Sequence, residues 1–464
     1  MFGRLKRIHF VGVGGSGMSG IAMVLHNLGF EVSGSDVKES ETLQRLAQAG
    51  IKVAVGHRAE YVEGAEVVVY SSAISGDNPE VVAARGREIP VIRRAEMLAE
   101  LMRMKFSIAI SGTHGKTTTT SLVAHVLVRA GLDPTTVVGG RVLDGESGAR
   151  LGQSEYLVAE ADESDRSFLV LYPSLAVVTN IEPEHLDFYK DISDLKREFT
   201  RFVNRVPFYG SVILGIDSVA VRGIRHRVKR RVVTYALEHP ADFTCRDVQL
   251  YGFTSAFTLI CRGNEIGRFS LPMAGYHNVQ NALAAIAVGS ELGIDFRTME
   301  QALATFSGVH RRLERRGERG GVVVYDDYGH HPTEVRVTLA ALRQAYPKDR
   351  LFVVFQPHRY TRTSLLGDEF GTSFDAADEV IVTRLYPASE TPIPGVDETK
   401  VVEAIRKRGR MGLTVHHLPE LDQVPEFLLS RVRAGDVILT QGAGNIAPLA
   451  EQILEALAGA GENR

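Results

Sequence analysis

Three times along the chain, an apolar stretch typical of a buried strand is followed by a glycine-containing loop and then by a helical pattern. These stretches cover residues 8–14 (IHFVGVG), 105–115 (KFSIAISGTHG) and 321–329 (GVVVYDDYG). Strands that alternate with helices predict parallel sheets with helices on both faces. The pattern therefore predicts an α/β fold with three separate beginnings.

The length of the chain supports the same number of domains. At about 150 residues per domain, a chain of 464 residues suggests three domains. A single core rarely grows beyond about 250–300 residues. We place the domain boundaries at residues 1–102, 103–309 and 310–464. Ser307 and Gly308, beside a short basic run, make residues 306–312 a candidate hinge.

The charge balance limits the partners that this chain can have. Lys and Arg number 53 and Asp and Glu number 56, so the formal net charge is −3. Without a basic excess, we expect neither nucleic acid nor a membrane as partner. We interpret one local basic run as solvated surface with no assigned function. Its members are Arg222, Arg225, Arg227, Lys229, Arg230 and Arg231.

The compartment can be predicted from apolar runs and cysteines. No uninterrupted apolar run approaches the roughly 18–20 residues that span a bilayer. Cys245 and Cys261 are too few for a disulfide framework, and their separation of 16 positions fits no metal-site pattern. We expect two small core residues in a reducing compartment, and hence a cytoplasmic protein.

The first glycine cluster predicts a diphosphate site. Residues 12–17 (GVGGSG) follow a strand and precede a helix, and Asp36 ends the next expected strand. This is the fingerprint of dinucleotide-binding folds, in which glycines let the backbone approach a pyrophosphate at a helix N-terminus. NAD, with Asp36 on a ribose hydroxyl, and another nucleotide diphosphate both fit this pattern.

The second glycine cluster predicts an ATP site. Residues 111–118 (SGTHGKTT) end in the G-K-T of a P-loop, although Ile110 stands where the full pattern has glycine. In such a loop the backbone N–H groups surround phosphates, Lys116 reaches the β- and γ-phosphates, and Thr117 holds Mg²⁺. The predicted ATP-binding residues here are Gly112, Thr113, His114, Gly115, Lys116, Thr117 and Thr118.

Acidic residues that follow the next strand suit a magnesium site. Glu160 and Asp162 end the stretch YLVAEAD, and Glu163 and Asp165 come just beyond. Carboxylates at a strand end are suitable hard ligands for Mg²⁺. A single histidine, His185 in NIEPEHLD, is a weak signal on its own.

Seven motifs in this order resemble the Mur ligases, which add amino acids to a cell-wall precursor. They are GTHGKTTTT, EADES, TNIEPEHLDFY, GYHNVQNALAAIA, HRRLE, DDYGHHPTE and FQPHRYTRT, and the resemblance runs from Gly12 to Gly444. It implies an N-terminal Rossmann-like domain for a UDP-sugar, a central P-loop ATPase-like domain, and a C-terminal Rossmann-like domain for an amino acid. The diphosphate at the first cluster would then belong to UDP-N-acetylmuramate.

The last two motifs most resemble the family member that acts on L-alanine. The implied reaction uses ATP and Mg²⁺ to join L-alanine to the lactyl carboxylate of UDP-N-acetylmuramate through an acyl phosphate. A monomer or weak homodimer is expected. Three alternatives remain: a sibling ligase that attaches a ready-made peptide, an NAD-dependent oxidoreductase, and a nucleotide-binding regulator without catalysis. The choice between alanine, serine and glycine stays open, because one methyl group discriminates by about 1–3 kcal/mol.

The resemblance also assigns residues. The implied catalytic residues are Lys116, Glu160, His185 and Arg312, and the implied metal ligands are Thr117, Glu160 and His185. Further ATP contacts would be His277, Asn278, Asn281, Arg312 and Asp327. The UDP-sugar would meet Gly14, Gly15, Ser16, Gly17, Met18, Ser19, Asp36, Ser71 and Ser72. L-Alanine would meet Tyr328, His330, His358 and Arg362, on two loops after neighbouring strands. Lys190 and Lys196 match no carbamylated lysine of related ligases, so no carbamate is expected.

Overall fold

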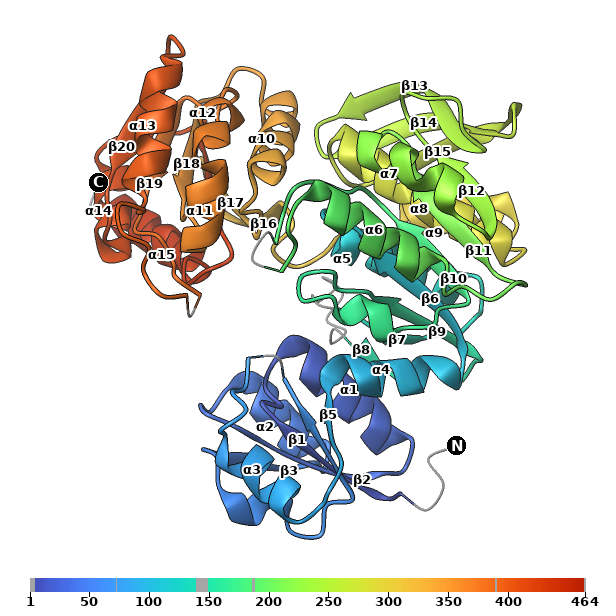
Figure 1. The fold of residues 1–464 in the computed structure, drawn as a ribbon. Coiled ribbons are helices and arrows are strands. Elements are labelled where there is room, and N and C mark those ends of the chain that lie inside the picture. The colour runs from blue at the N-terminus through green and yellow to red at the C-terminus, as the bar shows by residue number, and fades with distance from the viewer. Residues whose placement is uncertain (1–4, 72, 139–148, 186–187, 389, 463–464) are drawn as a thin grey trace. The chain divides into compact units, whose positions relative to one another are not determined.

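The computed structural model describes residues 5–462 except residues 72, 139–148, 186–187 and 389. The predicted residue Ser72 therefore lies outside the described residues. Three separate sheets, each flanked by helices, confirm the predicted α/β class (Figure 1). Contacts divide the chain into two compact units. One contains residues 1–246, 257–269 and 280–307, and the other contains residues 247–256, 270–279 and 308–464.

The first sheet has five strands in the order β3-β2-β1-β4-β5, and all of its strand pairs are parallel. The strands are β1 Arg7–Val11, β2 Glu31–Asp36, β3 Lys52–Val55, β4 Val67–Tyr70 and β5 Val91–Arg93. The helices are α1 Ser16–Asn27, α2 Glu41–Gln48, η1 Ala59–Val62, α3 Pro79–Gly86 and α4 Arg94–Arg103. β2 and β3 lie on one side of β1 and β4 and β5 lie on the other, so the strand order switches between β1 and β4. In open α/β sheets, ligands bind outside the carboxyl ends of the strands at such a switch point.

The second sheet has ten strands in the order β15-β14-β13-β12-β11-β10-β6-β9-β7-β8. The strands are β6 Phe106–Ser111, β7 Thr135–Val137, β8 Ala149–Arg150, β9 Tyr156–Glu160, β10 Leu175–Val178, β11 Ser211–Gly215, β12 Arg231–Tyr235, β13 Phe243–Tyr251, β14 Thr254–Cys261 and β15 Asn264–Leu271. The helices are α5 Lys116–Arg129, η2 Ser167–Val170, α6 Ile192–Val203, α7 Val219–Ile224, η3 Arg225–Arg227, α8 Tyr276–Glu291 and α9 Phe296–Ala304. β6 pairs in parallel with both β9 and β10, so the loops after these three strands meet at one edge.

The third sheet has six strands in the order β16-β17-β21-β18-β19-β20, and only the pair β16–β17 is antiparallel among its described pairs. The strands are β16 Glu314–Arg319, β17 Val322–Asp327, β18 Leu351–Phe355, β19 Glu379–Val382, β20 Thr414–His417 and β21 Val437–Gln441. The helices are α10 Pro332–Ala345, α11 Tyr360–Leu366, η4 Gly367–Glu369, α12 Phe370–Ser373, α13 Thr399–Arg408, η5 Leu421–Gln423, α14 Val424–Leu429 and α15 Leu449–Glu462.

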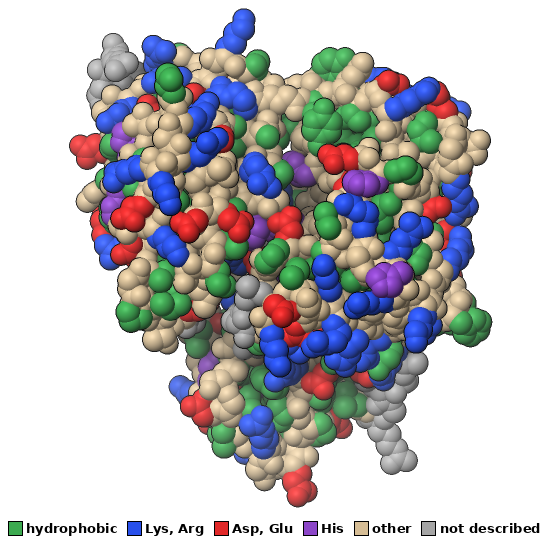
Figure 2. Space-filling model, turned by 45° about the horizontal axis from the view of Figure 1, so that its top comes forward, with side chains coloured by type: hydrophobic (Ala, Val, Ile, Leu, Met, Phe, Trp, Pro, Cys, Tyr) green, Lys and Arg blue, Asp and Glu red, His purple; other side chains and the backbone are tan. Residues whose placement is uncertain are grey.

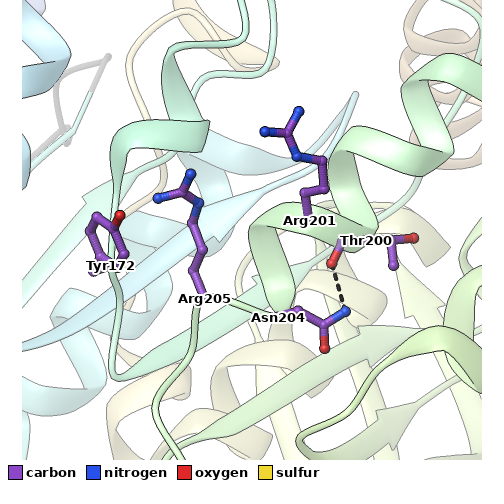
Figure 3. Close-up of a pocket in the computed structure, with 5 residues that line it drawn as sticks. All are labelled: Tyr172, Thr200, Arg201, Asn204 and Arg205. Atoms are coloured by element: carbon purple, nitrogen blue, oxygen red, sulfur yellow. Dashed lines mark hydrogen bonds between the residues drawn. The ribbon is translucent and has the colours of Figure 1, made fainter.

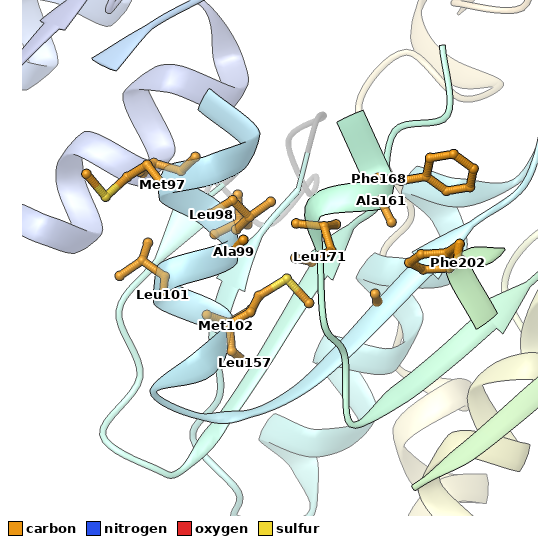
Figure 4. Close-up of a cluster of buried hydrophobic side chains, with 14 of the residues drawn as sticks. Met97, Leu98, Ala99, Leu101, Met102, Leu157, Ala161, Phe168, Leu171 and Phe202 are labelled. Carbon is orange, nitrogen blue, oxygen red and sulfur yellow. The ribbon is translucent and has the colours of Figure 1, made fainter. Parts of the chain in front are cut away.

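Helix α4 connects the first sheet to β6 and buries one apolar face. Its side chains Met97, Leu98, Leu101 and Met102 lie in a cluster that includes Leu157 of β9 (Figure 4). Each such side chain contributes about 1.5–3 kcal/mol when it is fully buried. This packing stabilises the strand that leads into the second glycine cluster.

The surface agrees with the balanced charge, but the cysteines differ from the prediction. Acidic and basic side chains are interspersed over the face shown in Figure 2. No helix among the described residues is long and apolar enough to cross a membrane. Cys245 and Cys261 are free thiols at intermediate exposure, so the prediction of two core residues is wrong. They lie on the peripheral strands β13 and β14, where a strand is covered on fewer sides than at the sheet centre.

Candidate functional site

The second glycine cluster forms the turn between β6 and α5, as the sequence predicts. Its backbone is bonded to the segment after β10. Thr113 N donates to Asn180 O at 3.0 Å, His114 N donates to Asn180 Oδ1 at 2.8 Å, and Thr179 Oγ1 donates to His114 O at 2.6 Å. The loop is therefore held in shape from a neighbouring strand before any ligand binds.

Two glycines in this loop have no room for a side chain. Gly112 has a φ of +136°, and a Cβ there would lie 2.0 Å from Thr179 Oγ1. Gly115 has a φ of +79°, and its Cβ would lie 2.7 Å from Asn281 Oδ1. Positive φ and close approach are the two conditions that require glycine. The loop thus exposes backbone at the N-terminus of α5, the geometry that binds phosphate.

Lys116 is the first residue of α5, and its ammonium group has a buried carboxylate partner. Nζ donates to Gly112 O at 2.6 Å, to Thr113 O at 3.2 Å and to Glu163 Oε1 at 2.8 Å. Burial by itself lowers the pKa of Lys116, but the charges of Glu163 and Asp162 outweigh burial and raise that pKa. Lys116 is therefore a fixed positive charge at the phosphate loop.

Glu163 responds to the same surroundings in the opposite way. Its side chain is 2% exposed, and burial raises the pKa of this carboxyl group to about 7 against the attraction of Lys116. Its second oxygen, Oε2, is buried and has no hydrogen-bond partner among the described residues. A buried oxygen of this kind costs free energy unless a cation or a proton satisfies it.

Of the predicted metal ligands, Thr117 lies in the first turn of α5, and the other two come from the strands that flank β6 or the loops after them. β9 ends at Glu160, and His185 follows β10. His185 has a φ of +55°, an unusual backbone conformation for a residue other than glycine. Thr117, Glu160 and the orphaned oxygen of Glu163 offer the hard oxygen donors that Mg²⁺ prefers, so the donor set fits this ion.

The first glycine cluster also forms a turn at the end of a strand. Gly12 has a φ of +80°, and Gly14 N donates to Asp36 Oδ2 at 2.8 Å. Asp36 therefore holds the glycine loop through at least one of its oxygens. Arg94, which the sequence analysis did not select, lies at the start of α1, because a Cβ on Gly17 would be 2.3 Å from its Nη1. Its charge suits a diphosphate at this turn.

A buried polar network beside this turn was also missed. Glu80 is 0% exposed and accepts from His9 Nε2 at 2.6 Å, from Ser35 Oγ at 2.8 Å and from His57 Nδ1 at 2.7 Å. Burial raises the pKa of Glu80, but the bonds from His9, Ser35 and His57 outweigh it, so the pKa is lowered. These residues come from four different segments, and no sequence spacing signals the network.

The predicted alanine residues gather in the third sheet. The rings of His330 and His358 have centroids 5.1 Å apart, and those of Tyr328 and His330 are 5.5 Å apart. Arg362 is 7% exposed, and its Nη1 donates to His358 O at 2.9 Å. The expectation of neighbouring strands is wrong, because β21 lies between β17 and β18. The two loops still meet because all three strands are parallel and end at the same edge.

Asp327 and Arg312, two predicted ATP residues, lie close to the predicted alanine residues. Asp327 accepts from Gly329 N at 2.7 Å, from Leu313 N at 2.8 Å and from Gln441 Nε2 at 3.1 Å. Its pKa is raised, chiefly by burial. The Arg312 guanidinium lies 5.4 Å from the Tyr328 ring centroid. This arrangement brings one predicted ATP residue next to a predicted alanine residue.

Helix α8 carries the three remaining predicted ATP residues. Burial and the nearby Arg312 charge lower the pKa of His277 to about 4, so its imidazole is neutral. Asn278 Nδ2 donates to Ala274 O at 2.8 Å. Asn281 Oδ1 accepts from Thr119 Oγ1 at 3.2 Å and so reaches the helix of the phosphate loop.

The basic run ends at Arg231, the first residue of β12, and so reaches the amino end of a strand in the second sheet. A pocket at the amino ends of β10 and β11 is lined by Tyr172, Thr200, Arg201, Asn204 and Arg205 (Figure 3). Lys229 N donates to Asn204 Oδ1 at 2.7 Å, which places this member of the basic run beside the pocket. None of the predicted site residues lines it.

Three family models match consecutive parts of the chain. They describe the Mur ligase family catalytic domain (residues 7–106), the Mur ligase middle domain (residues 110–289) and the Mur ligase glutamate ligase domain (residues 311–444). A UDP-N-acetylmuramate–L-alanine ligase of Desulfatibacillum aliphaticivorans is 52% identical over 454 residues, which cover 98% of this chain and 99% of that protein. The chain belongs to the Mur ligase family.

One further relative by sequence and one solved structure also resemble this Mur ligase. A protein of Geobacter sulfurreducens with the same name is 51% identical over 458 residues, covering 98% of this chain and 99% of that protein. The structure of UDP-N-acetylmuramate–alanine ligase MurC from Thermotoga maritima matches with a TM-score of 0.83 at 28% identity, covering 98% and 99% of the two chains. The predicted family and its three-domain architecture are confirmed. Membership of a ligase family excludes the alternative function of an NAD-dependent oxidoreductase.

Glu334 was not predicted as a site residue, although a helix-capping pattern in the sequence marks its position. Glu334 accepts from His330 N at 2.9 Å and lies 3.5 Å from Arg312 Nη1. It forms a capping box with His331 at the start of α10, with Pro332 as the first helical residue. Such a spacing is visible in the sequence. The stacking of Tyr386 on His358, with centroids 5.8 Å apart, has no such signal.

Proposed function

We propose that this Mur ligase joins L-alanine to the lactyl carboxylate of UDP-N-acetylmuramate and converts ATP to ADP and phosphate, in peptidoglycan precursor synthesis. The main support is the phosphate loop after β6, where Lys116 is fixed by two loop carbonyls and Glu163. Relatives that share about half of their residues over the full chain carry this activity in their names.

The reaction needs an activated carboxylate, because oxide is not a leaving group. A lactyl carboxylate oxygen attacks the γ-phosphorus of ATP, the bond to the β-γ bridging oxygen breaks, and ADP leaves. The L-alanine nitrogen then attacks the acyl carbon to give a tetrahedral intermediate. The bond to phosphate breaks, the nitrogen loses a proton, and an amide remains. Lys116 and the loop N–H groups stabilise the negative charge on the transferred phosphoryl group.

Magnesium would be held by Thr117 and Glu160, with His185 at a second ion. When bound, Mg²⁺ supplies neutralisation of phosphate charge. One oxygen of the Glu163 carboxylate binds Lys116, and its second oxygen is buried without a hydrogen-bond partner among the described residues, so that oxygen is available to a cation. The fixed Lys116 charge and the positive N-terminus of α5 balance the phosphates on the other side.

The outer domains would bind the two substrates that are joined. In the first sheet, Gly14, Gly17 and Arg94 surround the diphosphate of the sugar nucleotide. In the third sheet, Arg362 pairs with the alanine carboxylate through its planar fork. His330 and His358 orient the ammonium group or take its proton, since an imidazole has a pKa near neutrality.

Phosphate release tests this proposal. Purified protein is assayed with ATP, Mg²⁺ and UDP-N-acetylmuramate across a panel of free amino acids and L-alanine-containing peptides. We expect release that requires both the sugar nucleotide and L-alanine. Release that is indifferent to UDP-N-acetylmuramate would refute the proposal, and preference for a peptide over L-alanine would assign the chain to peptide recycling.

A further inference from the structure

Arg166 has an unusual backbone conformation for a long side chain. Its φ is +64° and its ψ is +9°, in the left-handed region that glycine and asparagine prefer. Such a conformation is strained and persists where surrounding contacts impose it. Arg166 lies six residues after Glu160, in the loop that also contains Glu163.

The guanidinium of Arg166 connects this loop to the loop that follows β10. Its Nη2 and Nε donate to Phe188 O at 2.8 and 3.2 Å, and Nη2 also donates to Asp194 Oδ2 at 2.7 Å. The same group lies 5.0 Å from the ring centroid of Tyr189. One side chain therefore reaches a backbone carbonyl and an aromatic ring of the loop after β10, and a carboxylate in the first turn of α6.

These contacts extend to the groups that the proposed function uses. Phe188 N and Tyr189 N both donate to His185 O, at 2.9 and 3.0 Å. Tyr189 is 1% exposed, and its hydroxyl donates to Glu163 O. Arg166 N also donates to Glu163 O, at 3.1 Å. The segments that carry Glu163 and His185 are thus joined through Arg166 and Tyr189.

We propose that Arg166 is a positioning residue. It fixes the segment at the end of β9, which carries Glu160 and Glu163, against the loop after β10, which carries His185, and so sets the affinity for Mg²⁺. This inference rests on the proposed function, because Glu160 and His185 are metal ligands within it. Arg166 is not among the residues assigned to substrate or metal in the proposed function. Its backbone strain is maintained by the guanidinium contacts, which explains why an arginine occupies a position that glycine would fill without strain.

Matched variants separate positioning from stability. Arg166→Ala removes the guanidinium, Arg166→Gly removes it and relieves the backbone strain, and Arg166→Lys keeps the charge. Arg197→Ala is the control, because Arg197 contacts the same Asp194 carboxylate, is 60% exposed, and makes no hydrogen bond to Phe188 among the described residues. Glu160, His185 and Glu163 stay unchanged in every variant.

The first readout is the Mg²⁺ concentration that half-saturates ADP binding in calorimetry. We expect Arg166→Ala and Arg166→Gly to raise it by about 10–100-fold, as is typical when a residue that orients metal ligands is lost. Arg166→Lys should recover part of the affinity, and Arg197→Ala should match the wild type. An unchanged Mg²⁺ dependence in Arg166→Ala, or an equal change in Arg197→Ala, would overturn the proposal.

The second readout needs neither metal nor activity. A protease that cleaves only after lysine reports on Lys190, an exposed residue of the loop after β10. Cleavage there should be several-fold faster in Arg166→Gly than in the wild type or Arg197→Ala, while the unfolding temperature of Arg166→Gly is not lowered. Equal cleavage rates would contradict the positioning role. Failure of the proposed function is distinguishable, since it would show as absent ligase activity in the wild type.

Discussion

The pair Lys116–Glu163 leads to a prediction in which activity and stability change together. In Lys116→Met the ammonium group 2.8 Å from Glu163 Oε1 is replaced by an apolar chain of similar length. The rate of phosphate release should fall by about 10²–10³-fold, because a preorganised charge at the transferred phosphoryl group is lost. Glu163, whose side chain is 2% exposed, then has no counter-charge at hydrogen-bond distance from its carboxylate among the residues that the structure describes.

The stability effect depends on pH, and its sign follows from the raised pKa of Glu163. In the wild type this pKa is about 7, above the ordinary value of 4.5, so the free energy of unfolding falls as the pH rises from 4.5 to 7 and then levels off. Without Lys116 the pKa rises further, and the fall continues above pH 7 at about 1.4 kcal/mol per pH unit. Loss of one partner of a buried ion pair costs about 3–5 kcal/mol. We therefore expect Lys116→Met to lower the free energy of unfolding by about 3–5 kcal/mol at pH 8.5. At pH 7 the loss should be smaller by about 2 kcal/mol.

Urea unfolding followed by far-ultraviolet circular dichroism at pH 6, 7 and 8.5 measures this difference. Lys116→Met/Glu163→Gln should lose the part of the pH dependence that comes from Glu163, because the carboxyl group of that residue is gone. Lys105→Met is the matched control, since Lys105 Nζ donates to a carbonyl oxygen, Ser154 O, rather than to a carboxylate. A stability loss in Lys116→Met that is the same at pH 6 and pH 8.5 would refute the assignment of the buried charge to Glu163.

Three further predictions concern the three sheets. Glu80→Gln should destabilise the first sheet by about 2–3 kcal/mol through weaker bonds to a formerly charged acceptor. Because the pKa of Glu80 is lowered from 4.5, this contribution is lost as the pH falls below 4.5, so acid denaturation should separate wild type and variant less at pH 3 than at pH 7. Gly112→Ala should abolish ATP binding in calorimetry, because its Cβ would lie 2.0 Å from Thr179 Oγ1, whereas Gly131→Ala, with φ +77° and open space, should bind normally. Arg362→Lys should raise KM for L-alanine about tenfold or more with a smaller change in kcat, because lysine lacks the planar fork; an unchanged KM would remove Arg362 from the alanine site.

The local features of this Mur ligase were predictable because they depend on neighbouring residues. Alternating strands and helices predicted the α/β class, and each glycine cluster was placed at a strand-to-helix turn. Gly112 and Gly115 have positive φ angles, a local backbone requirement that a motif records directly, although the side chains that crowd them, Thr179 and Asn281, are distant in the sequence. The position of Lys116 at the start of α5 follows from the same motif.

The tertiary structure decided which distant groups meet. Glu163 is 47 positions from Lys116, and Glu80 is 71 positions from His9, so no local spacing could pair them. The insertion of β21 between β17 and β18 contradicts the expectation of neighbouring strands, since strand order is fixed by long-range packing of the whole sheet. The sequence by itself determined the turns and the charged groups available at them. Only the folded chain determined their partners, because burial and the pairing of buried charges depend on segments that are far apart in the sequence.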